Sequence, residues 1–493
     1  MTTADVEIST GLVRGALSDG IWRYLGIPYA APPVGARRFE LPIRPESWTG
    51  VREATDPGAN APQIHKPFPG LDVVPLIGTG WIPGDDYLTL NVWAPEGSPQ
   101  KLPVMVFIHG GGFVLGSKDA PVQDGASFAR SGLICVSINY RLGVEGFLPI
   151  PGVPTNLGLR DQIFALQWVR DNIAAFGGDP DNVTVFGESA GAMSVANLLV
   201  SPLAKSLFRR AIVQSGHGAM VRDPDIAQRL VRKIARLMKI TPDEAGFRSK
   251  PPEAFFPAIQ KLAKPFAIDL RDEAGREPVF GISRFIPVHG DDVLPEHPEA
   301  LLRKGAGAEV ELLIGTNREE MNLYFGPTGV RAKINRLLAR FLLSRSQPKA
   351  GKVLRDYGLG RPGVRPGDAL TLALSDLVFR RPARRFAGAH QGRTWVYEFE
   401  WQSPAGQGTL GACHGIDLPF VFDTLATVTG PQGVAGENPP QAVADRVHGL
   451  WAEFARSGTL PWEEYDGATR MVHELASGET VHEPVMPAAA HIG

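Results

Sequence analysis

The stretch that decides the fold of this chain is NVTVFGESAGAMSV, at residues 182–195. Residues 183–186 are a β-branched and aromatic run typical of a buried strand, and the small and apolar residues after Gly191 are typical of a helix. Between the two lies a G-x-S-x-G pentapeptide centred on Ser189. Strand, pentapeptide and helix together match the nucleophile-elbow pattern, in which a sharp turn holds a serine hydroxyl above a sheet.

The glycines on either side of Ser189 are required by such a turn, because a Cβ there would collide with the strand or the helix. The turn places the hydroxyl at a helix N-terminus, where N–H groups and the helix dipole favour developing negative charge. The pentapeptide alone fits equally well a glycine-rich loop with an incidental serine, since short motifs recur by chance. Its flanking elements and the candidate partners below favour the elbow.

The composition predicts an ordinary globular protein. Of the 493 residues, 43% are hydrophobic and 21% are charged, and no linker-like segment divides the chain, so we expect one domain over residues 1–493. The net charge of −2 gives no electrostatic footprint for nucleic acid or an anionic membrane. Residues 1–28 lack a secretory signal pattern, and Cys135 and Cys413 are too few for a disulfide framework. We expect a cytoplasmic monomer or weak homodimer with no nucleic-acid or membrane partner.

Predicted strands alternate with predicted helices along much of the chain. Besides residues 183–186, apolar runs predict strands at residues 88–93, 104–108, 134–138, 211–214, 311–314 and 394–399. Apolar residues spaced by three and four from Ile163 to Phe176 predict an amphipathic helix, which Asn156 or Asp161 would cap. This alternation predicts an α/β fold with a mostly parallel central sheet flanked by helices.

The segments outside this alternation are longer and less regular. Residues 216–285 and 335–382 are largely helical and charged, and we interpret their basic faces as solvated surface. Residues 63–84 form a loop rich in Pro and Gly that carries several large apolar side chains. Such a loop covers either the rim of an active site or its own core, and both interpretations stay open.

A serine nucleophile needs a base and an orienting acid, which follow an elbow of this kind in the order Ser, Asp or Glu, His. His414 lies in a loop of small residues after the predicted strand 394–399, where an imidazole has room to approach a serine. A turn histidine is the alternative. Glu319 and Glu320 follow the predicted strand 311–314, at the strand end where open α/β sheets place their sites. Spacing does not separate these two carboxylates.

The predicted strand 104–108 runs directly into His109-Gly110-Gly111-Gly112-Phe113. This matches the HGGG-type loop whose backbone N–H groups stabilise an oxyanion. A phosphate-binding loop is disfavoured, because Gly116 falls one residue too late for G-x-G-x-x-G and no Lys-Ser or Lys-Thr pair follows. No H-E-x-x-H and no Cys or His pairs at ligand spacing occur, so we expect neither a metal nor a cofactor.

With these motifs together, the chain resembles the type-B carboxylesterases, a family that includes the bacterial para-nitrobenzyl esterases and the cholinesterases. The resemblance runs almost from end to end. The motifs that carry it are GIPYA at residues 26–30, LNVWAP at 90–95, NYRLG at 139–143, FGGDP at 176–180, QSG at 214–216, GTNREE at 315–320, and His414 with the apolar run after it. It implies an α/β-hydrolase fold with helical insertions at roughly residues 216–285 and 321–390 on the regulatory or cap side.

The resemblance also implies catalytic roles for single residues. Ser189 matches the family's nucleophile and His414 its base. Glu320 matches the acid, because it lies five residues after Gly315, and this favours Glu320 over Glu319.

The same resemblance implies the remaining parts of the site. The oxyanion donors match the N–H groups of Gly111, Gly112 and Ala190. Ser215 matches a serine that hydrogen-bonds near the acid and the base. A strand-end serine that satisfies local backbone is an equal alternative for Ser215.

The chain departs from the family pattern in two places. The E-D-C-L-Y-L-N signature reads DDYLTLN at residues 85–91, so that Tyr87 and Ala61 replace a pair of disulfide-forming cysteines. Met321 replaces the usual glycine after the acid. The first departure fits a reducing compartment and frees the 63–84 loop, and the second changes the packing beside Glu320.

These features predict a serine carboxylesterase that hydrolyses apolar or aromatic esters through a Ser-His-Glu triad and an acyl-enzyme. An aryl carbamate or amide hydrolase with the same machinery is the alternative, and a non-catalytic adhesion relative or a lipase is less favoured. We expect a small-molecule ester as the partner. Candidate pocket walls, from position alone, are Phe113, Leu115, Trp81, His217 and Phe325. A surface histidine is an equal interpretation of His217.

Overall fold

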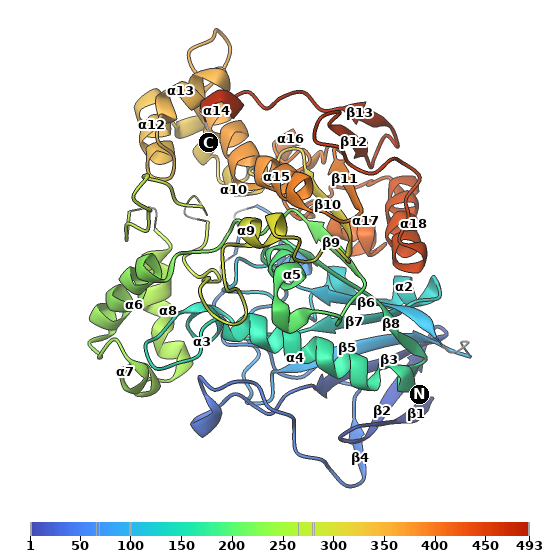
Figure 1. Cartoon of the computed structure of the whole chain (residues 1–493). Coiled ribbons are helices and arrows are strands. Elements are labelled where there is room, and N and C mark those ends of the chain that lie inside the picture. The colour runs from blue at the N-terminus through green and yellow to red at the C-terminus, as the bar shows by residue number, and fades with distance from the viewer. Residues whose placement is uncertain are drawn as a thin grey trace.

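A computed structural model gives the architecture of the chain, and it describes residues 2–65, 67–68, 70–97, 101–264, 266–278, 280 and 282–491. Within these residues, thirteen strands form one sheet in the order β1-β2-β3-β5-β7-β6-β8-β9-β10-β11-β12-β13, with β4 beside β2 (Figure 1). The strands are β1 (Thr3–Ile8), β2 (Gly11–Ser18), β3 (Ile21–Pro28), β4 (Val51–Glu53), β5 (Thr89–Pro95), β6 (Leu102–Ile108), β7 (Ile134–Ile138), β8 (Gly178–Glu188), β9 (Arg210–Gln214), β10 (Glu311–Asn317), β11 (Thr394–Phe399), β12 (Met471–Glu474) and β13 (Thr480–His482).

Helices fill the connections between these strands and surround the sheet (Figure 1). They are α1 (Val74–Ile77), α2 (Ala126–Arg130), α3 (Gly143–Phe147), α4 (Leu157–Asn172), α5 (Ala190–Val200), α6 (Pro224–Met238), α7 (Glu244–Arg248), α8 (Phe256–Leu262), α9 (Pro298–Arg303), α10 (Asn322–Phe325), α11 (Val330–Lys333), α12 (Arg336–Ser344), α13 (Ala350–Asp356), α14 (Pro366–Ser375), α15 (Arg381–Ala389), α16 (Ala405–Gly408), α17 (Leu418–Val421) and α18 (Gln441–Ser457). The helices α6 to α9 follow β9, and α10 to α15 lie between β10 and β11.

The centre of the sheet is parallel, and this confirms the fold predicted from the sequence. Strands β7, β6, β8, β9, β10, β11 and β12 pair in parallel with their neighbours, whereas β1, β2, β3 and β5 add antiparallel pairs at one side and β13 adds one at the other. The carboxyl ends of parallel strands meet at one edge of a sheet, which is where such folds form their sites.

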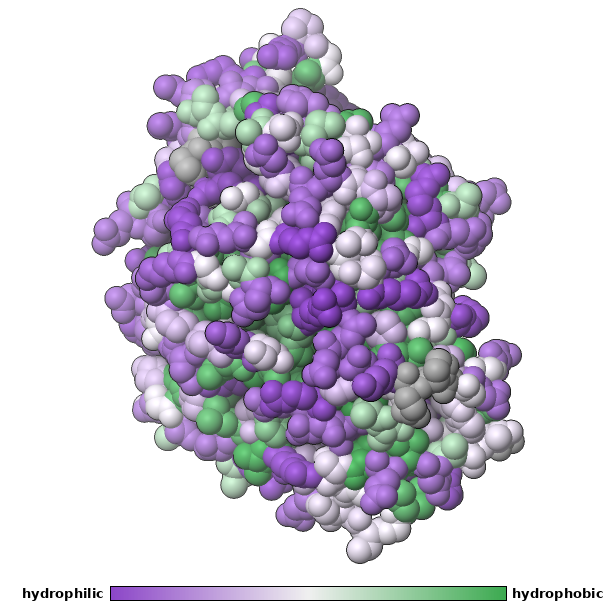
Figure 2. Space-filling view, turned by 45° about the vertical axis from the view of Figure 1, so that its right-hand side comes forward, coloured by the Kyte–Doolittle hydropathy of each residue, from purple (hydrophilic) through white to green (hydrophobic). Residues whose placement is uncertain are grey.

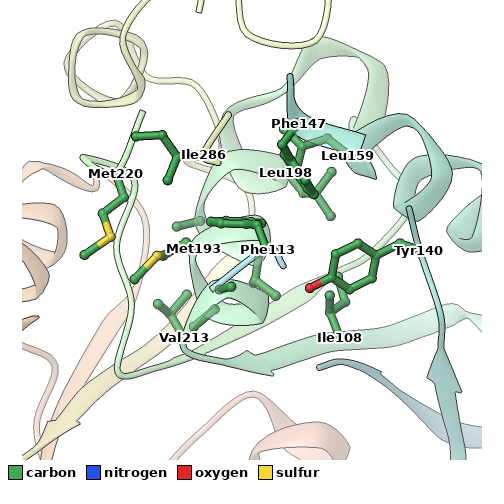
Figure 3. Close-up of a cluster of buried hydrophobic side chains, with 14 of the residues drawn as sticks. Ile108, Phe113, Tyr140, Phe147, Leu159, Met193, Leu198, Val213, Met220 and Ile286 are labelled. Atoms are coloured by element: carbon green, nitrogen blue, oxygen red, sulfur yellow. The ribbon is translucent and has the colours of Figure 1, made fainter. Parts of the chain in front are cut away.

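The sheet separates two hydrophobic cores, because successive side chains of a strand point to opposite faces. In β6, Val104 and Val106 belong to one core and Met105 and Phe107 to the other. The first core lies under α4 and α5, and Figure 3 shows part of it with Phe113 among the buried side chains. The second core packs against α17 and α18.

Two local expectations need correction. Asn156 occupies the N-cap position of α4, but it is left-handed and its side chain makes no capping bond. It instead bonds the backbone of Val288, donating to the carbonyl at 2.8 Å and accepting the N–H at 2.9 Å. Asp161 lies inside the helix, fully buried, where its carboxylate pairs with Arg141 at 2.7 Å. Both side chains are taken up by long-range partners, which sequence patterns do not reveal.

The chain's two cysteines, Cys135 and Cys413, are buried free thiols. No helix in the described ranges is long and apolar enough to cross a lipid bilayer. On the face drawn in Figure 2, hydrophilic residues predominate and hydrophobic ones are scattered among them.

Candidate active site

The turn at Ser189 has the strained geometry of a nucleophile elbow. Ser189 follows β8 with φ 56° and ψ −122° and is the N-cap residue of α5, an uncommon conformation for a residue with a side chain. A Cβ on Gly191 would lie 1.9 Å from the Ile108 carbonyl oxygen, and one on Gly187 would lie 2.6 Å from the backbone of Gly191. Both positions therefore require glycine. The Ser189 N–H donates to the Gln214 carbonyl of β9 at 2.9 Å, which holds the turn against the sheet.

Three side chains from distant parts of the sequence form one hydrogen-bonded line. Ser189 Oγ lies 2.8 Å from His414 Nε2, and His414 Nδ1 lies 2.6 Å from Glu320 Oε2. The serine is 8% exposed, whereas the carboxylate is fully buried. The line is thus shielded from water at its acid end and reachable at its hydroxyl end.

The two adjacent carboxylates after β10 point in different directions. Glu320 Oε1 accepts the Asn317 N–H at 2.8 Å, which leaves Oε2 for His414. Glu319 Oε2 instead accepts the Ala412 N–H at 2.7 Å. The geometry therefore brings Glu320 and not Glu319 to the imidazole, a choice that strand and loop spacing left open.

Further hydrogen bonds join the loops that carry Glu320 and His414. The His414 N–H donates to the Glu320 carbonyl at 3.1 Å. Asn317 Nδ2 donates to the Cys413 carbonyl at 2.8 Å and to Asp417 Oδ1 at 3.1 Å. Asn317 thus holds the acid with its backbone and the loop of the base with its side chain.

The glycine loop after β6 is fixed beside the elbow. Gly111 and Gly112 adopt φ 105° and 61°, and a Cβ on Gly111 would lie 2.0 Å from the Leu115 carbonyl oxygen. Ser283 Oγ donates to the Gly112 carbonyl at 2.6 Å. Within the described ranges, the N–H groups of Gly111, Gly112 and Ala190 have no protein acceptor, so they are free to bind a ligand oxygen.

A second carboxylate faces the imidazole. Glu188 Oε1 lies 3.2 Å from His414 Nε2 and accepts no hydrogen bond from any residue that the structure describes. Burial raises the pKa of Glu188 to about 8. Burial by itself lowers the pKa of His414, but the charges of Glu188 and Glu320 outweigh it and raise that pKa to about 9. The two groups are coupled, because protonation of Glu188 removes a charge that supports the imidazolium.

Comparison with known proteins assigns this fold and geometry to a family. The sequence model described as "Carboxylesterase family" matches residues 2–483. The chain belongs to the carboxylesterase family. Its fold is the α/β-hydrolase fold, and its activity is that of a serine hydrolase acting on carboxylic esters.

Individual relatives agree with the family assignment. The chain is 36% identical to the para-nitrobenzyl esterase of Bacillus subtilis (strain 168), over 98% of this chain and 96% of that one. It is 34% identical to the phenmedipham hydrolase of Pseudarthrobacter oxydans (93% and 91% covered) and 33% identical to the cholinesterase of Mus musculus (92% and 78% covered). A solved para-nitrobenzyl esterase structure superposes with a TM-score of 0.84 at 33% identity, over 100% of both chains.

Two polar residues near the triad of this carboxylesterase lie differently from expectation. Ser215 is buried, but its Oγ has no hydrogen-bond partner among the described residues. Within the described residues, this hydroxyl therefore forms neither the expected bond near the acid nor the alternative bond to local backbone. His217 is not a surface histidine: it is buried, its Nε2 lies 2.7 Å from the Val378 carbonyl, and burial lowers its pKa to about 4.

Two cavities are each lined by one of the candidate pocket residues, Leu115 or His217. An apolar cavity of about 240 Å³ lies beside the glycine loop, and its lining includes Phe68, Val114, Leu115, Phe256 and Ile259. A larger, polar cavity of about 740 Å³ has His217, Ile226 and Leu377 in its lining. In the 63–84 loop, Leu71, Val73 and Leu76 are buried in the second core, as one of the two interpretations expected, while Phe68 and Ile77 line the apolar cavity.

The five candidate pocket residues divide between cavity and core. Leu115 lines the apolar cavity and His217 the polar one. Trp81 stacks edge-on against Phe256 with ring centroids 5.6 Å apart, behind the wall of the apolar cavity. Phe113 is fully buried and packs on Phe147 in the first core, so it lines neither cavity (Figure 3). Phe325 is half-buried against the same core.

Three residues that the sequence analysis did not single out contribute to the site. Glu188 lies inside the elbow pentapeptide. A charged residue within a motif that is expected to be buried is a sequence feature that could have pointed to its role. Asn317 lies in the loop of the acid, and its role depends on side-chain direction. Ser283 contacts a residue 171 positions earlier in the chain and sits in an irregular segment, so no sequence pattern points to it.

Proposed function

We propose that Ser189 is the nucleophile of this carboxylesterase, His414 its base and Glu320 the acid that orients the base. The observation that carries the proposal is the pair of hydrogen bonds, 2.8 Å and 2.6 Å long, that join them. His414 takes the hydroxyl proton as Ser189 Oγ attacks the ester carbonyl, and Glu320 stabilises the imidazolium. His414 then protonates the leaving alcohol. Water, deprotonated by His414, finally releases the acid from the acyl-enzyme.

The proposal assigns the oxyanion to the N–H groups of Gly111, Gly112 and Ala190. Support comes from their lack of protein acceptors within the described ranges and from the contacts that fix the glycine loop. Donors that are already aimed at the developing charge need no reorganisation during the reaction. Removing one such donor typically lowers turnover by about 10²–10³.

The preferred substrates are esters with a compact apolar or aromatic group. Support comes from the apolar cavity of about 240 Å³, whose wall includes Val114 and Leu115, the two residues directly after the glycine loop. An apolar group that leaves water for such a cavity gains roughly 25 cal/mol per Å² of buried surface. A para-nitrophenyl ester with an aliphatic acyl chain is therefore a suitable first substrate.

The experiment that tests the triad is the Ser189→Ala variant. We expect at least about a 10⁴-fold loss of kcat on a para-nitrophenyl ester with unchanged thermal unfolding, since the nucleophile is removed without a change in packing. Ser215→Ala is the matched control, because it removes a buried hydroxyl that has no hydrogen-bond partner in the described part of the chain. Full activity of Ser189→Ala, or equal losses in both variants, would reject the proposal.

A second candidate function is cleavage of aryl carbamates or amides by the same residues. The observation that favours it is the 34% identity to a phenmedipham hydrolase. The comparison of kcat/KM for an ester and a carbamate that share one aryl leaving group separates the two. A higher value for the carbamate would make carbamate hydrolysis the main activity.

The proposal also includes a cytoplasmic location and a monomeric or weakly dimeric state. The location is supported by Cys135 and Cys413, which are buried free thiols and fit a reducing compartment. Sedimentation of the purified chain over a range of concentrations tests the oligomeric state.

A further inference from the structure

Helix α12 turns large apolar side chains toward solvent. Leu337 is 77% exposed, Leu338 is 37% exposed and Phe341 is 50% exposed. Phe266, itself 53% exposed, stacks on Phe341 with ring centroids 5.1 Å apart. These four and Val330 are five of the twelve exposed large hydrophobic residues in the described part of the chain. Exposed apolar surface that gathers in this way marks an interaction site.

The same segment carries charge of one sign. Between Glu320 and Asp356 the sequence has eight basic residues and no acidic one. They are Arg331, Lys333, Arg336, Arg340, Arg345, Lys349, Lys352 and Arg355. Arg331 and Arg345 pair with carboxylates at 3.5 Å and 3.7 Å, and the other six have no ion pair with any residue that the structure describes. This positive charge is therefore largely uncompensated.

A shallow hollow of about 470 Å³ lies beside Phe341, between α12 and α13. Its charged lining residues are Arg340, Lys349, Lys352 and Arg355, and none of its described lining residues is acidic. The Arg340 guanidinium lies over the first turn of α13, because a Cβ on Gly351 would come within 2.8 Å of its Nη2. A hollow with several Lys and Arg donors and no carboxylate suits a phosphate group.

We propose that α12 and this hollow dock the protein on an anionic lipid surface. Leu337, Phe341 and Phe266 enter the boundary between headgroups and acyl chains, and Arg340 and Lys352 contact lipid phosphates. An apolar stripe flanked by Lys and Arg is typical of helices that lie in a membrane interface. Each basic residue near an anionic leaflet strengthens such binding. The attachment is peripheral and reversible.

Other occupants fit this surface less well. Nucleic acid would use the basic residues, but exposed leucines contribute nothing to phosphate contacts. A second copy of the chain, placed face to face, would set eight basic residues against the same eight.

The net charge of the whole chain, −2, predicts no membrane contact. That total includes acidic residues elsewhere in the chain, so it does not show that this segment is positively charged. Figure 1 places α12 and α13 at the outer edge of the molecule, where a flat surface has access to them.

The test is co-sedimentation of the full chain with phosphatidylcholine vesicles, with and without phosphatidylglycerol. We expect binding to the anionic vesicles at low ionic strength, its loss at high ionic strength, and none to phosphatidylcholine alone. Arg340→Glu with Lys352→Glu should weaken binding at least about tenfold. The matched control is Arg232→Glu with Arg236→Glu, which makes the same charge change at exposed positions of α6 and should keep wild-type binding.

A second pair of variants tests the apolar contribution. Leu337→Ser should weaken vesicle binding several-fold, whereas Leu203→Ser, an exposed leucine far from α12 in the sequence, should leave it unchanged. All four variants should hydrolyse a soluble aryl ester at the wild-type rate. This rate shows that the variants are folded, and it makes loss of vesicle binding distinguishable from loss of catalysis. Absence of binding to anionic vesicles, or equal binding by Arg340→Glu/Lys352→Glu, would overturn the proposal. A dimer in solution that Leu337→Ser disrupts, or preferential binding of duplex DNA, would also overturn it.

Discussion

Glu188 Oε1 lies 3.2 Å from His414 Nε2, the same nitrogen that lies 2.8 Å from the Ser189 hydroxyl. The imidazole therefore contacts carboxylates at both of its nitrogens, because Nδ1 meets Glu320. Glu320 orients the ring along the line to the serine, whereas Glu188 sits beside that line. Glu188 thus acts mainly through its charge.

That charge predicts a shift in the pH profile of Glu188→Gln. His414 must be neutral to act as a base, and Glu188 helps to raise its pKa to about 9. Removing the charge lowers this pKa, so the rising limb of kcat/KM against pH should move to lower pH by about one unit or more. Glu319→Gln is the control, because Glu319 bonds Ala412 rather than the imidazole. An unchanged profile for Glu188→Gln, or a shift to higher pH, would contradict the assigned role.

Asn317→Ala should lower kcat about tenfold or more and leave KM nearly unchanged. The side-chain amide holds the Cys413 carbonyl and Asp417, and without it the loop of the base loses its attachment to the loop of the acid. Loss of these buried bonds should also cost about 1–3 kcal/mol of unfolding free energy. Asn322 lies on α10, and Asn322→Ala, which removes its side-chain bonds to the Leu410 carbonyl and to Arg331, is the matched control. Equal kinetic effects in the two variants would mean that Asn317 acts only through general stability.

Ser283→Ala should lower kcat several-fold for esters. Its hydroxyl holds the Gly112 carbonyl at 2.6 Å, and a glycine loop without this bond has more freedom to turn its N–H groups away from the oxyanion. The measurements are kcat for an ester and the affinity for a trifluoromethyl ketone, an inhibitor that forms a tetrahedral adduct with the serine. We expect both kcat and this affinity to fall together. Normal turnover with normal inhibitor binding would show that the loop needs no such support.

Filling one cavity at a time identifies the one that accepts the bulky group of the substrate. Ile259→Trp narrows the apolar cavity and should lower kcat/KM about tenfold or more for aryl esters with long acyl chains, but not for the corresponding acetate. Ile226→Trp narrows the polar cavity and should have no such effect. The opposite pattern would assign the bulky group to the polar cavity.

The strands at the centre of the sheet were predicted correctly from the sequence, but the residues at which some strands begin and end were not. The strands β7 and β11 begin and end as predicted, because both are short runs of mainly β-branched and aromatic or other apolar residues that are buried throughout. Strand β8 begins at Gly178, five residues before its predicted start, because that glycine pairs with Leu102 of β6. Register with a neighbouring strand, rather than side-chain pattern, decides such boundaries.

The same holds for the site: some of its parts can be predicted from local sequence, and others depend on contacts between distant residues. The elbow and the glycine loop are predictable because a missing Cβ is a local requirement, as the contacts at Gly191 and Gly111 show. Which of Glu319 and Glu320 reaches the imidazole depends on side-chain direction, and only the resemblance to a family separated them beforehand. Phe113 looked like a pocket wall by position, but its positive φ of 63° accompanies a ring that packs in the core.

The most direct test of the catalytic assignment is the site of covalent labelling by an aryl phosphonate. A phosphonate ester that inactivates the enzyme should add one phosphonyl group per chain, and peptide mapping should place that group on Ser189. His414→Ala should be labelled far more slowly, because no base takes the hydroxyl proton. Full inactivation with the phosphonyl group on any other residue would contradict the account.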